Sequence, residues 1–258
     1  MSKLIYLDNS ATSFPKPDVV YDFMNDFYRK HGVNPGRSGF DAAVETEEVV
    51  NSTRKMLTKL FNGGTDHNRL TFSYNATDSL NLIINGLVEK GIHVVSTMLE
   101  HNSVLRPLNM HHQNGTIDVT YVSFDENGYV HPDDIKKAIR PNNKFVVVTH
   151  CSNVLGTIQP LAEIGKVCKE KGVIFVVDGS QGAGAVDLDM QASNIDVYCF
   201  TGHKCLMGPT GIGGSYVREG IEIKHTRAGG TGVRSAYPVH LDEYPYRLEY
   251  GTLNLLGV

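Results

Sequence analysis

The sequence predicts an α/β protein in which helices cover both faces of a mostly parallel β-sheet. From about Arg69 onward, apolar runs of strand length alternate with segments of helical period. Several of the apolar runs are continuous stretches of Val, Ile and Phe, which are typical of parallel strands buried on both faces. At 258 residues and 41% apolar composition, the chain is long enough to bury such a core.

The expected strands and helices alternate along this part of the chain. Strands are expected at residues 70–73, 93–97, 117–123, 145–149, 173–177, 197–200 and 212–217. Helices are expected between them, for example at residues 78–88, 132–139 and 161–171. Most of these helices begin at Asp, Ser or Pro, and Gly86, Gly91 and Gly172 are interpreted as their ends.

Two helical segments precede the sheet and form an N-terminal helical region over residues 1–65. They are expected at residues 18–30 and 41–60, and the first carries an amphipathic stripe made of Val20, Phe23, Met24, Phe27 and Tyr28. The loop of residues 31–39 between them is rich in Gly and Pro and contains Arg37. A plain helix connection is the favoured interpretation, and a substrate-facing loop is the alternative.

The last part of the sequence is apolar. After residue 217 the alternating pattern loosens, and residues 253–258 read Leu-Asn-Leu-Leu-Gly-Val without a polar tail. We therefore expect this segment to pack against a surface that the chain itself does not supply.

Composition and charge favour a protein that acts on small molecules. The formal net charge is −4 and Lys and Arg are scattered, which argues against nucleic acid and anionic membrane surfaces as partners. No apolar run is long enough to span a membrane, and the first residues lack the apolar core of a signal peptide. The four cysteines are irregularly spaced, so a reducing cytoplasm is expected. No metal site and no dinucleotide site is expected, because zinc-type ligand spacing and a GxGxxG after an early strand are both missing.

The strongest chemical signal is Lys204, which follows the apolar strand at 197–200 within the sequence Thr-Gly-His-Lys and precedes a glycine-rich turn. Poor solvation of an ammonium group there lowers its pKa, so that the free amine can attack a carbonyl and form an imine. A lysine that extends out of a tight turn into solvent is the alternative.

Asp178 ends another apolar strand, 26 residues before Lys204. A carboxylate in this position can pair with a protonated pyridine nitrogen and make the ring an electron sink. A turn or helix cap is the alternative role for an Asp at the end of a strand.

Three further polar clusters follow apolar strands. Residues 73–79 form a strand-to-helix turn whose free N–H groups favour a phosphate, with Thr77 offering a hydroxyl, although a capped helix explains them equally well. His101 can stack on a planar cofactor or move a proton, and Asn153 can donate a hydrogen bond to a phenolic oxygen. In open α/β sheets ligands bind at the carboxyl ends of the strands, so these clusters together indicate one site.

The chain resembles the class V aminotransferase family of pyridoxal-phosphate (PLP) enzymes, and within it the cysteine desulfurase and selenocysteine lyase group. The resemblance covers essentially the whole sequence. Its motifs are residues 6–12 (Tyr-Leu-Asp-Asn-Ser-Ala-Thr), 75–81, 100–102, 177–181 (Val-Asp-Gly-Ser-Gln) and 201–204 (Thr-Gly-His-Lys). The resemblance implies the large domain of PLP fold type I over residues 1–258, with the family's smaller C-terminal domain absent from this chain.

The resemblance also implies a role for each matching residue. Lys204 would form the Schiff base with PLP and move the Cα proton, Asp178 would pair with the pyridine nitrogen, and His101 would stack over the ring. The remaining cofactor contacts would be the phosphate ligands Ala76 (backbone), Thr77, Thr201 and His203, and the ring-oxygen ligands Asn153 and Gln181. Thr252, in Gly-Thr, would reach the phosphate of the neighbouring subunit, which implies a homodimer.

The implied function is a PLP-dependent cysteine desulfurase or selenocysteine lyase. Its substrate would be a small amino acid, cysteine or selenocysteine, which forms an external aldimine and loses its Cα proton, and a sulfur-acceptor protein is a possible partner. The family's catalytic cysteine and carboxylate-binding arginine have no counterpart here, so no cysteine is assigned as catalytic. A class V aminotransferase and a catalytically silent, truncated PLP-binding subunit are the alternatives.

Overall fold

A computed structural model describes residues 4–35, 39–234 and 236–258. Arg37, in the Gly- and Pro-rich loop, lies outside these ranges. The described residues begin with an extended arm, which is followed by two helices, α1 (Asp18–His31) and α2 (Asp41–Leu60), and by a short 3₁₀ turn at His67–Arg69. The expected pair of N-terminal helices is confirmed.

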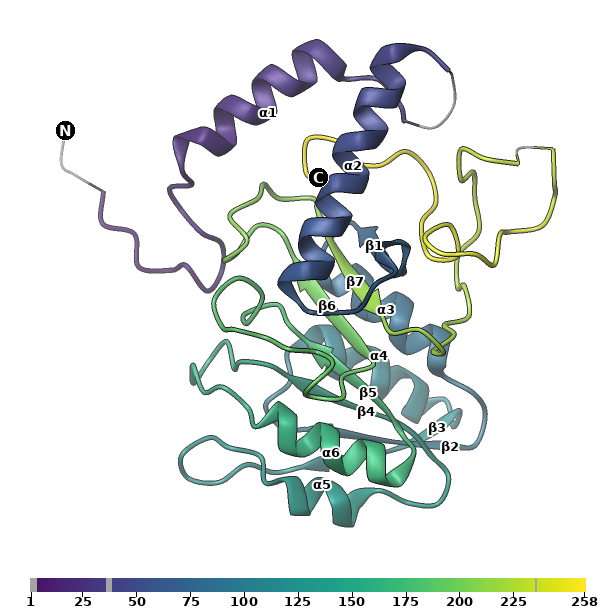
Figure 1. Cartoon of the computed structure of the whole chain (residues 1–258). Helices are drawn as coiled ribbons and strands as arrows, with labels where there is room; N and C mark the ends of the chain where they lie inside the picture. Colours follow the sequence, from purple (N-terminus) through teal and green to yellow (C-terminus); the bar gives the residue numbers. More distant parts are fainter. Residues whose placement is uncertain (1–3, 36–38, 235) are drawn as a thin grey trace.

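A seven-stranded sheet forms the centre of the molecule (Figure 1). Its strands are β1 (Leu70–Ser73), β2 (Ile92–Thr97), β3 (Ile117–Val122), β4 (Asn143–Thr149), β5 (Ile174–Asp178), β6 (Val197–Thr201) and β7 (Gly213–Val217). They lie in the order β1-β7-β6-β5-β4-β2-β3, and β7 is antiparallel to β1 and β6 while β2 to β6 are mutually parallel. Each expected strand is confirmed, with small shifts at its ends.

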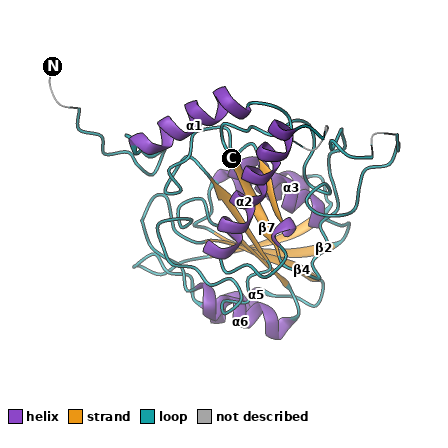
Figure 2. Ribbon diagram, turned by 45° about the horizontal axis from the view of Figure 1, so that its top comes forward, coloured by secondary structure: helices purple, strands orange, loops and turns teal. Residues whose placement is uncertain are grey.

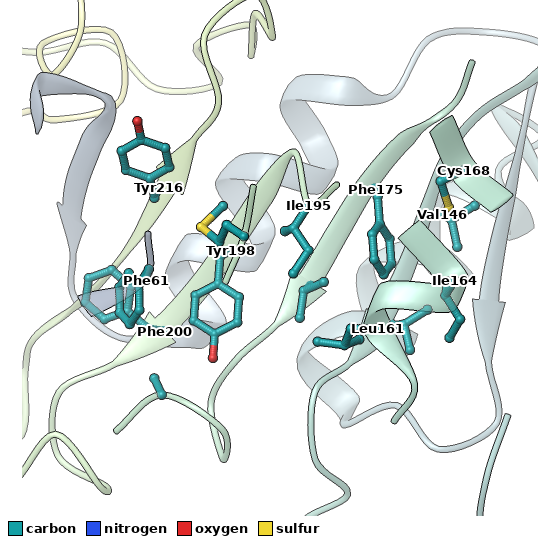
Figure 3. Packing of buried hydrophobic residues seen from close by; sticks show 14 of the residues in the cluster. Phe61, Val146, Leu161, Ile164, Cys168, Phe175, Ile195, Tyr198, Phe200 and Tyr216 are labelled. Atoms are coloured by element: carbon teal, nitrogen blue, oxygen red, sulfur yellow. The ribbon is translucent and has the colours of Figure 1, made fainter. Parts of the chain in front are cut away.

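Helices cover both faces of this sheet, as Figures 1 and 2 show. They are α3 (Ala76–Leu87), α4 (Asn102–Gln113), α5 (Pro132–Ala138) and α6 (Leu161–Lys171). α5, α6 and part of α2 bury apolar side chains on one face, where the Phe61 ring lies 5.0 Å from Tyr198 and 5.3 Å from Phe200 (Figure 3). α3 and α4 cover the other face through residues such as Ile83 and Val104. Successive residues of the central strands point alternately into these two cores, so the strands are buried on both faces. The predicted α/β class is confirmed.

The direction of chain crossover reverses between β2 and β4. β3 lies on one side of β2, and β4, β5 and β6 lie on the other. The pairing of β2 with β4 ends at Val95 and Val146, although both strands continue beyond these residues. The carboxyl ends of the two strands therefore diverge, and such a reversal is where open α/β sheets bind ligands.

Helix α3 differs from its expected bounds. It begins at Ala76 rather than at residue 78 and ends at Leu87, so Gly86 lies inside the helix and does not terminate it. A Cβ atom on Gly86 would lie 2.4 Å from Ile223 Cγ2 and 2.5 Å from the Lys224 carbonyl oxygen. This glycine is therefore required for close packing. Gly172 does end its helix, in the left-handed conformation that favours glycine.

Two further points concern α4 and the end of the chain. α4 contains Pro107 in its interior, where a proline cannot donate a helical hydrogen bond. The prediction for residues 253–258 is wrong: Leu253, Leu255 and Val258 pack against the chain's own core.

α1 buries no residue among those described, and Phe23 in its apolar stripe is 60% exposed. None of the helices within the described ranges has the length and apolarity needed to cross a membrane.

Candidate active site

An open pocket of about 470 Å³ lies at the carboxyl ends of the central strands. It contains every residue assigned from the sequence except Thr252. Its lining comprises Asp8, Ser10, Ala11, Asn75, Ala76, Thr77, His101, Ser103, Thr149, Cys151, Asn153, Asp178, Ser180, Gln181, Thr201, His203 and Lys204. The fold thus brings together side chains that are far apart in the sequence.

Lys204 lies in the turn that follows β6 and lines the pocket. The turn is closed by backbone bonds in which Gly208 N–H donates to Gly202 O at 2.8 Å and Met207 N–H donates to Lys204 O at 2.9 Å. Burial lowers the pKa of Lys204, and the nearby carboxylate of Asp178 opposes this shift. A larger fraction of the amine is therefore free at neutral pH, as a nucleophilic lysine requires.

Asp178, the last residue of β5, is 2% exposed and faces the same pocket. Its Oδ1 atom accepts hydrogen bonds from Ser180 N–H at 2.9 Å and from the Ser180 hydroxyl at 2.5 Å. These donors stabilise the ionised carboxylate and also fix the turn, so the capping role and the charge-pairing role exist together.

The residues behind Asp178 do not neutralise its charge. His150 N–H donates to the Asp178 carbonyl oxygen at 2.8 Å, and the His150 ring lies 3.1 Å from the Tyr198 hydroxyl. Burial lowers the pKa of His150 to about 4, so this ring is neutral at pH 7. The charge of Asp178 is thus available to a cationic group in the pocket.

An anion-binding corner is formed by the start of α3 and the end of β6. The Asn75 side chain caps α3 by accepting from Asp78 N–H at 2.9 Å, which leaves the earlier N–H groups at Ala76 and Thr77 without a helical partner. Among the described residues, the buried Thr201 Oγ1 atom has no hydrogen-bond partner. A Cβ atom on Gly213 would lie 2.6 Å from Asn75 C, so this glycine lets β7 pack closely beneath the corner. A phosphate group fits these donors.

The N-terminal arm holds the turn that carries His203 and Lys204. The carbonyl oxygen of His203 accepts from Ser13 N–H at 3.1 Å, from the Thr12 hydroxyl at 3.0 Å and from Lys16 Nζ at 3.1 Å. The Thr12 hydroxyl also lies 3.0 Å from His203 Nδ1. The sequence analysis assigned no role to these arm residues, and their only signal was the motif at residues 6–12.

The three residues expected around a planar ring all line this pocket. His101 caps α4, and its Nδ1 atom accepts from Ser103 N–H at 3.2 Å, which fixes the orientation of the ring. Gln181 donates through Nε2 to the Ser10 carbonyl oxygen at 2.9 Å, so only one of its amide N–H groups remains for a ligand. Asn153 lies on the exposed rim. Their roles toward a cofactor stay predictions.

Thr252 is exposed and lies outside this pocket. The segment before it is anchored by Glu249, whose carboxylate binds Arg54 of α2 through bonds of 2.6 and 2.7 Å. The prediction that Thr252 reaches the phosphate of a neighbouring subunit stays a prediction.

Buried thiols account for three of the four cysteines. Burial raises the pKa of Cys151 to about 11 and that of Cys199 to about 12, and it also raises the pKa of Cys168. These groups are therefore neutral thiols at pH 7 and poor nucleophiles. Cys151 lines the pocket, together with Thr149 and Asn153 of the same segment.

Comparisons with known proteins identify chains with similar sequences and similar structures. The sequence is 35% identical over 234 residues to the cysteine desulfurase IscS of Clostridium botulinum, a match that covers 89% of this chain and 57% of that protein. The apo structure of a cysteine desulfurase from Thermococcus onnurineus superposes with a TM-score of 0.87 at 33% identity, covering 98% of this chain and 64% of that one. A structure described as SspA in complex with cysteine gives a TM-score of 0.87 at 27% identity, covering 98% of this chain and 70% of that one.

The chain spans under two thirds of the length of the curated relatives that it matches. The profile of the family described as aminotransferase class-V matches residues 5–258, nearly all of the sequence. The chain therefore belongs to the class V aminotransferase family.

Proposed function

We propose that this chain is the PLP-binding part of a cysteine desulfurase or selenocysteine lyase. The observation that carries the proposal is the single pocket in which Lys204, Asp178, His101 and the start of α3 meet. The names of the relatives support the same activity, since they are cysteine desulfurases.

The residues of the pocket fit PLP at each of its functional groups. The N–H groups at the start of α3, with the hydroxyls of Thr77 and Thr201, would hold the phosphate. Asp178 would bind the protonated ring nitrogen, and His101 would cover one face of the ring. His203, Gln181 and Asn153 would complete the contacts from the pocket wall.

When bound, PLP supplies an aldehyde that reacts with amines and a ring that accepts electrons from Cα. Lys204 would take the Cα proton of the substrate through Nζ, because burial favours its neutral amine. Asp178 would keep the proton on the ring nitrogen, since the neighbouring His150 ring is neutral at pH 7 and does not neutralise the carboxylate. The N-terminal arm would hold Lys204 in place by binding the His203 carbonyl oxygen.

The substrate, the assembly and the partners extend this proposal. Cysteine is the favoured substrate, because a structural relative is described in complex with it. We assign no sulfur-accepting cysteine within these residues, because Cys151, Cys168 and Cys199 are buried thiols and the partly exposed Cys205 does not line the pocket. A homodimer in which Thr252 completes the neighbouring site, a sulfur-acceptor protein and a cytoplasmic location are parts of the same proposal.

Borohydride reduction with PLP tests the cofactor assignment. We expect the reduced cofactor on the peptide that contains Lys204, located by mass spectrometry, and no such adduct in Lys204→Arg. An adduct spread over surface lysines would contradict the assignment.

The substrate is tested in the same preparation by solvent deuterium exchange at Cα of cysteine, which needs no sulfur acceptor, and by the release of alanine. Deuterium exchange at Cα without release of alanine would indicate that this chain catalyses the proton transfer but not the removal of sulfur.

A further inference from the structure

Glu100 is a buried acid at the reversal point of the sheet, and the proposed mechanism does not use it. It is 6% exposed and directly precedes His101. Its Oε1 atom accepts from the Thr97 hydroxyl at 2.7 Å and from Thr149 N–H at 2.9 Å. Thr97 ends β2 and Thr149 ends β4, so one carboxyl group joins the two strand ends where their own ladder has stopped.

Burial of Glu100 favours its protonated form. Among the described residues, its Oε2 atom is buried and has no hydrogen-bond partner. Burial raises the pKa of Glu100 to about 8, and the like charge of Asp178 adds to this shift while the bonds from Thr97 and Thr149 oppose it. A buried carboxylate without a cationic partner is costly, so a neutral acid is the stable species at pH 7.

Other titratable groups at this edge of the sheet do not change that conclusion. Burial keeps His150 neutral and Cys151 protonated at pH 7. The ammonium group of Lys204 interacts with the carboxylate of Asp178. Asp178 ends β5, the strand that pairs with β6, and Lys204 follows β6. His101 follows Glu100 in the chain but directs Nδ1 toward Ser103.

We propose that Glu100 is a positioning residue that works as a neutral acid and sets the distance between His101 and Asp178 across the pocket. One of its bonds fixes the β2 end, which leads into His101. The other fixes Thr149, which pairs with Asp178 in the sheet. The inference rests on the proposed function, because the object between these two residues is the PLP ring.

Loss of the Glu100 proton would place a second negative charge beside Asp178. The two carboxylates would repel each other, and the unpaired buried charge would draw the Glu100 side chain toward water and away from Thr97 and Thr149, because burial and Asp178 outweigh the two bonds that favour the charge. The β2 and β4 ends would then separate, and the ring would be held less tightly. PLP affinity is therefore expected to fall as Glu100 ionises.

The test measures PLP affinity on both sides of pH 8 in the full chain, in Glu100→Gln and in Glu100→Ala. Gln retains the acceptor oxygen and replaces the acid O–H by an N–H, so Glu100→Gln is expected to bind PLP as tightly as the wild type at neutral pH. At alkaline pH the wild type should weaken by about tenfold relative to Glu100→Gln, the effect of about one buried hydrogen bond. Glu100→Ala should bind weakly at every pH. Ionisation of Lys204 or of PLP affects the wild type and Glu100→Gln equally, so it does not contribute to the difference between their affinities.

Infrared spectroscopy of the protein without PLP reports the proton directly. The difference between wild type and Glu100→Gln at neutral pH should contain the carbonyl band of a protonated carboxylic acid, and this band should disappear at alkaline pH. The inference is overturned if the band is absent, if the two pH profiles coincide, or if Glu100→Gln binds as weakly as Glu100→Ala. A wild type that shows the band but forms no PLP adduct on Lys204 would instead reject the proposed function, and the ring-positioning role with it.

Discussion

Single residues determine the charge of the pocket. Asp178 ends β5, and Glu100 follows the end of β2. Both acids are buried, but their surroundings give them different roles. Asp178 receives two hydrogen bonds from Ser180 at its Oδ1 atom. Glu100 has one oxygen without a partner among the described residues. Both acids accept two hydrogen bonds, so burial makes the difference: it raises the pKa of Glu100 to about 8, and Glu100 keeps its proton at pH 7.

Asp178→Asn removes the charge that would hold a proton on the ring nitrogen. We expect PLP still to attach to Lys204, because the anion-binding corner and the lysine are unchanged. Cα deuterium exchange should fall by about 100-fold or more, the scale of a lost electrostatic contact at a reacting centre. Quantitative NMR of the exchanging substrate measures the rate, and Asp189→Asn, at an Asp outside the pocket, is the matched control. Unchanged exchange in Asp178→Asn would contradict the assigned role.

The ionisation of Glu100 also predicts how stability depends on pH. The pKa is about 8 in the folded chain and the ordinary value is 4.5, so the folded state keeps a proton that the unfolded state loses between these values. The stabilisation is complete below pH 4.5 and is lost as the pH rises toward 8. Relative to Glu100→Gln, the free energy of unfolding should decrease across this range by several kcal/mol, an order-of-magnitude figure. Urea unfolding without PLP at a series of pH values measures the difference, and parallel curves would refute the shift.

At the scale of elements, the packing of α3 shows how a residue type can be misinterpreted. Gly86 was expected to end the helix, because glycine is common just after helix ends. In the structure it allows the segment at Ile223 and Lys224 to cross the helix at close range. A local pattern cannot distinguish these roles, because the crossing segment is more than a hundred residues away in the sequence.

Gly86→Ala tests this packing. The added methyl group would raise helix propensity, yet it would overlap Ile223 and the Lys224 carbonyl group. We expect net destabilisation of about 1 to 3 kcal/mol, typical of overpacking, measured by chemical unfolding. Gly229→Ala, where the nearest atom lies 3.4 Å away, should change stability little. A stabilised Gly86→Ala variant would show that the crossing segment moves aside at no cost.

At the scale of the whole molecule, a buried ion pair joins the N-terminal helices to the last residues of the chain. Arg54 of α2 binds Glu249 through two bonds, and Glu249 also accepts from Phe72 N–H at 2.6 Å in β1. Arg54 lies over the Phe72 ring at 4.6 Å. The pair therefore ties three distant segments together near Thr252.

Glu249→Leu leaves Arg54 buried without its partner. We expect a loss of about 3 to 5 kcal/mol in the free energy of unfolding, the usual cost of an unpaired buried charge. The double variant Arg54→Met, Glu249→Leu should recover most of this loss, since no buried charge remains. Chemical unfolding of the wild type, of both single variants (Glu249→Leu and Arg54→Met) and of the double variant gives the coupling energy, and additive effects would mean that water reaches Arg54.

The sequence alone determined the α/β class, each strand of the sheet and the polar clusters after the strands that gather in the pocket. These features are local: apolar runs define strands, and polar residues after parallel strands must meet at one edge of the sheet. Only the tertiary structure showed the arm that holds His203, the packing of Leu253, Leu255 and Val258 against the core, and the bridge that Glu100 makes between β2 and β4. The physical reason is that burial and hydrogen bonding between distant segments depend on how the chain crosses itself, and no local pattern in the sequence records those crossings.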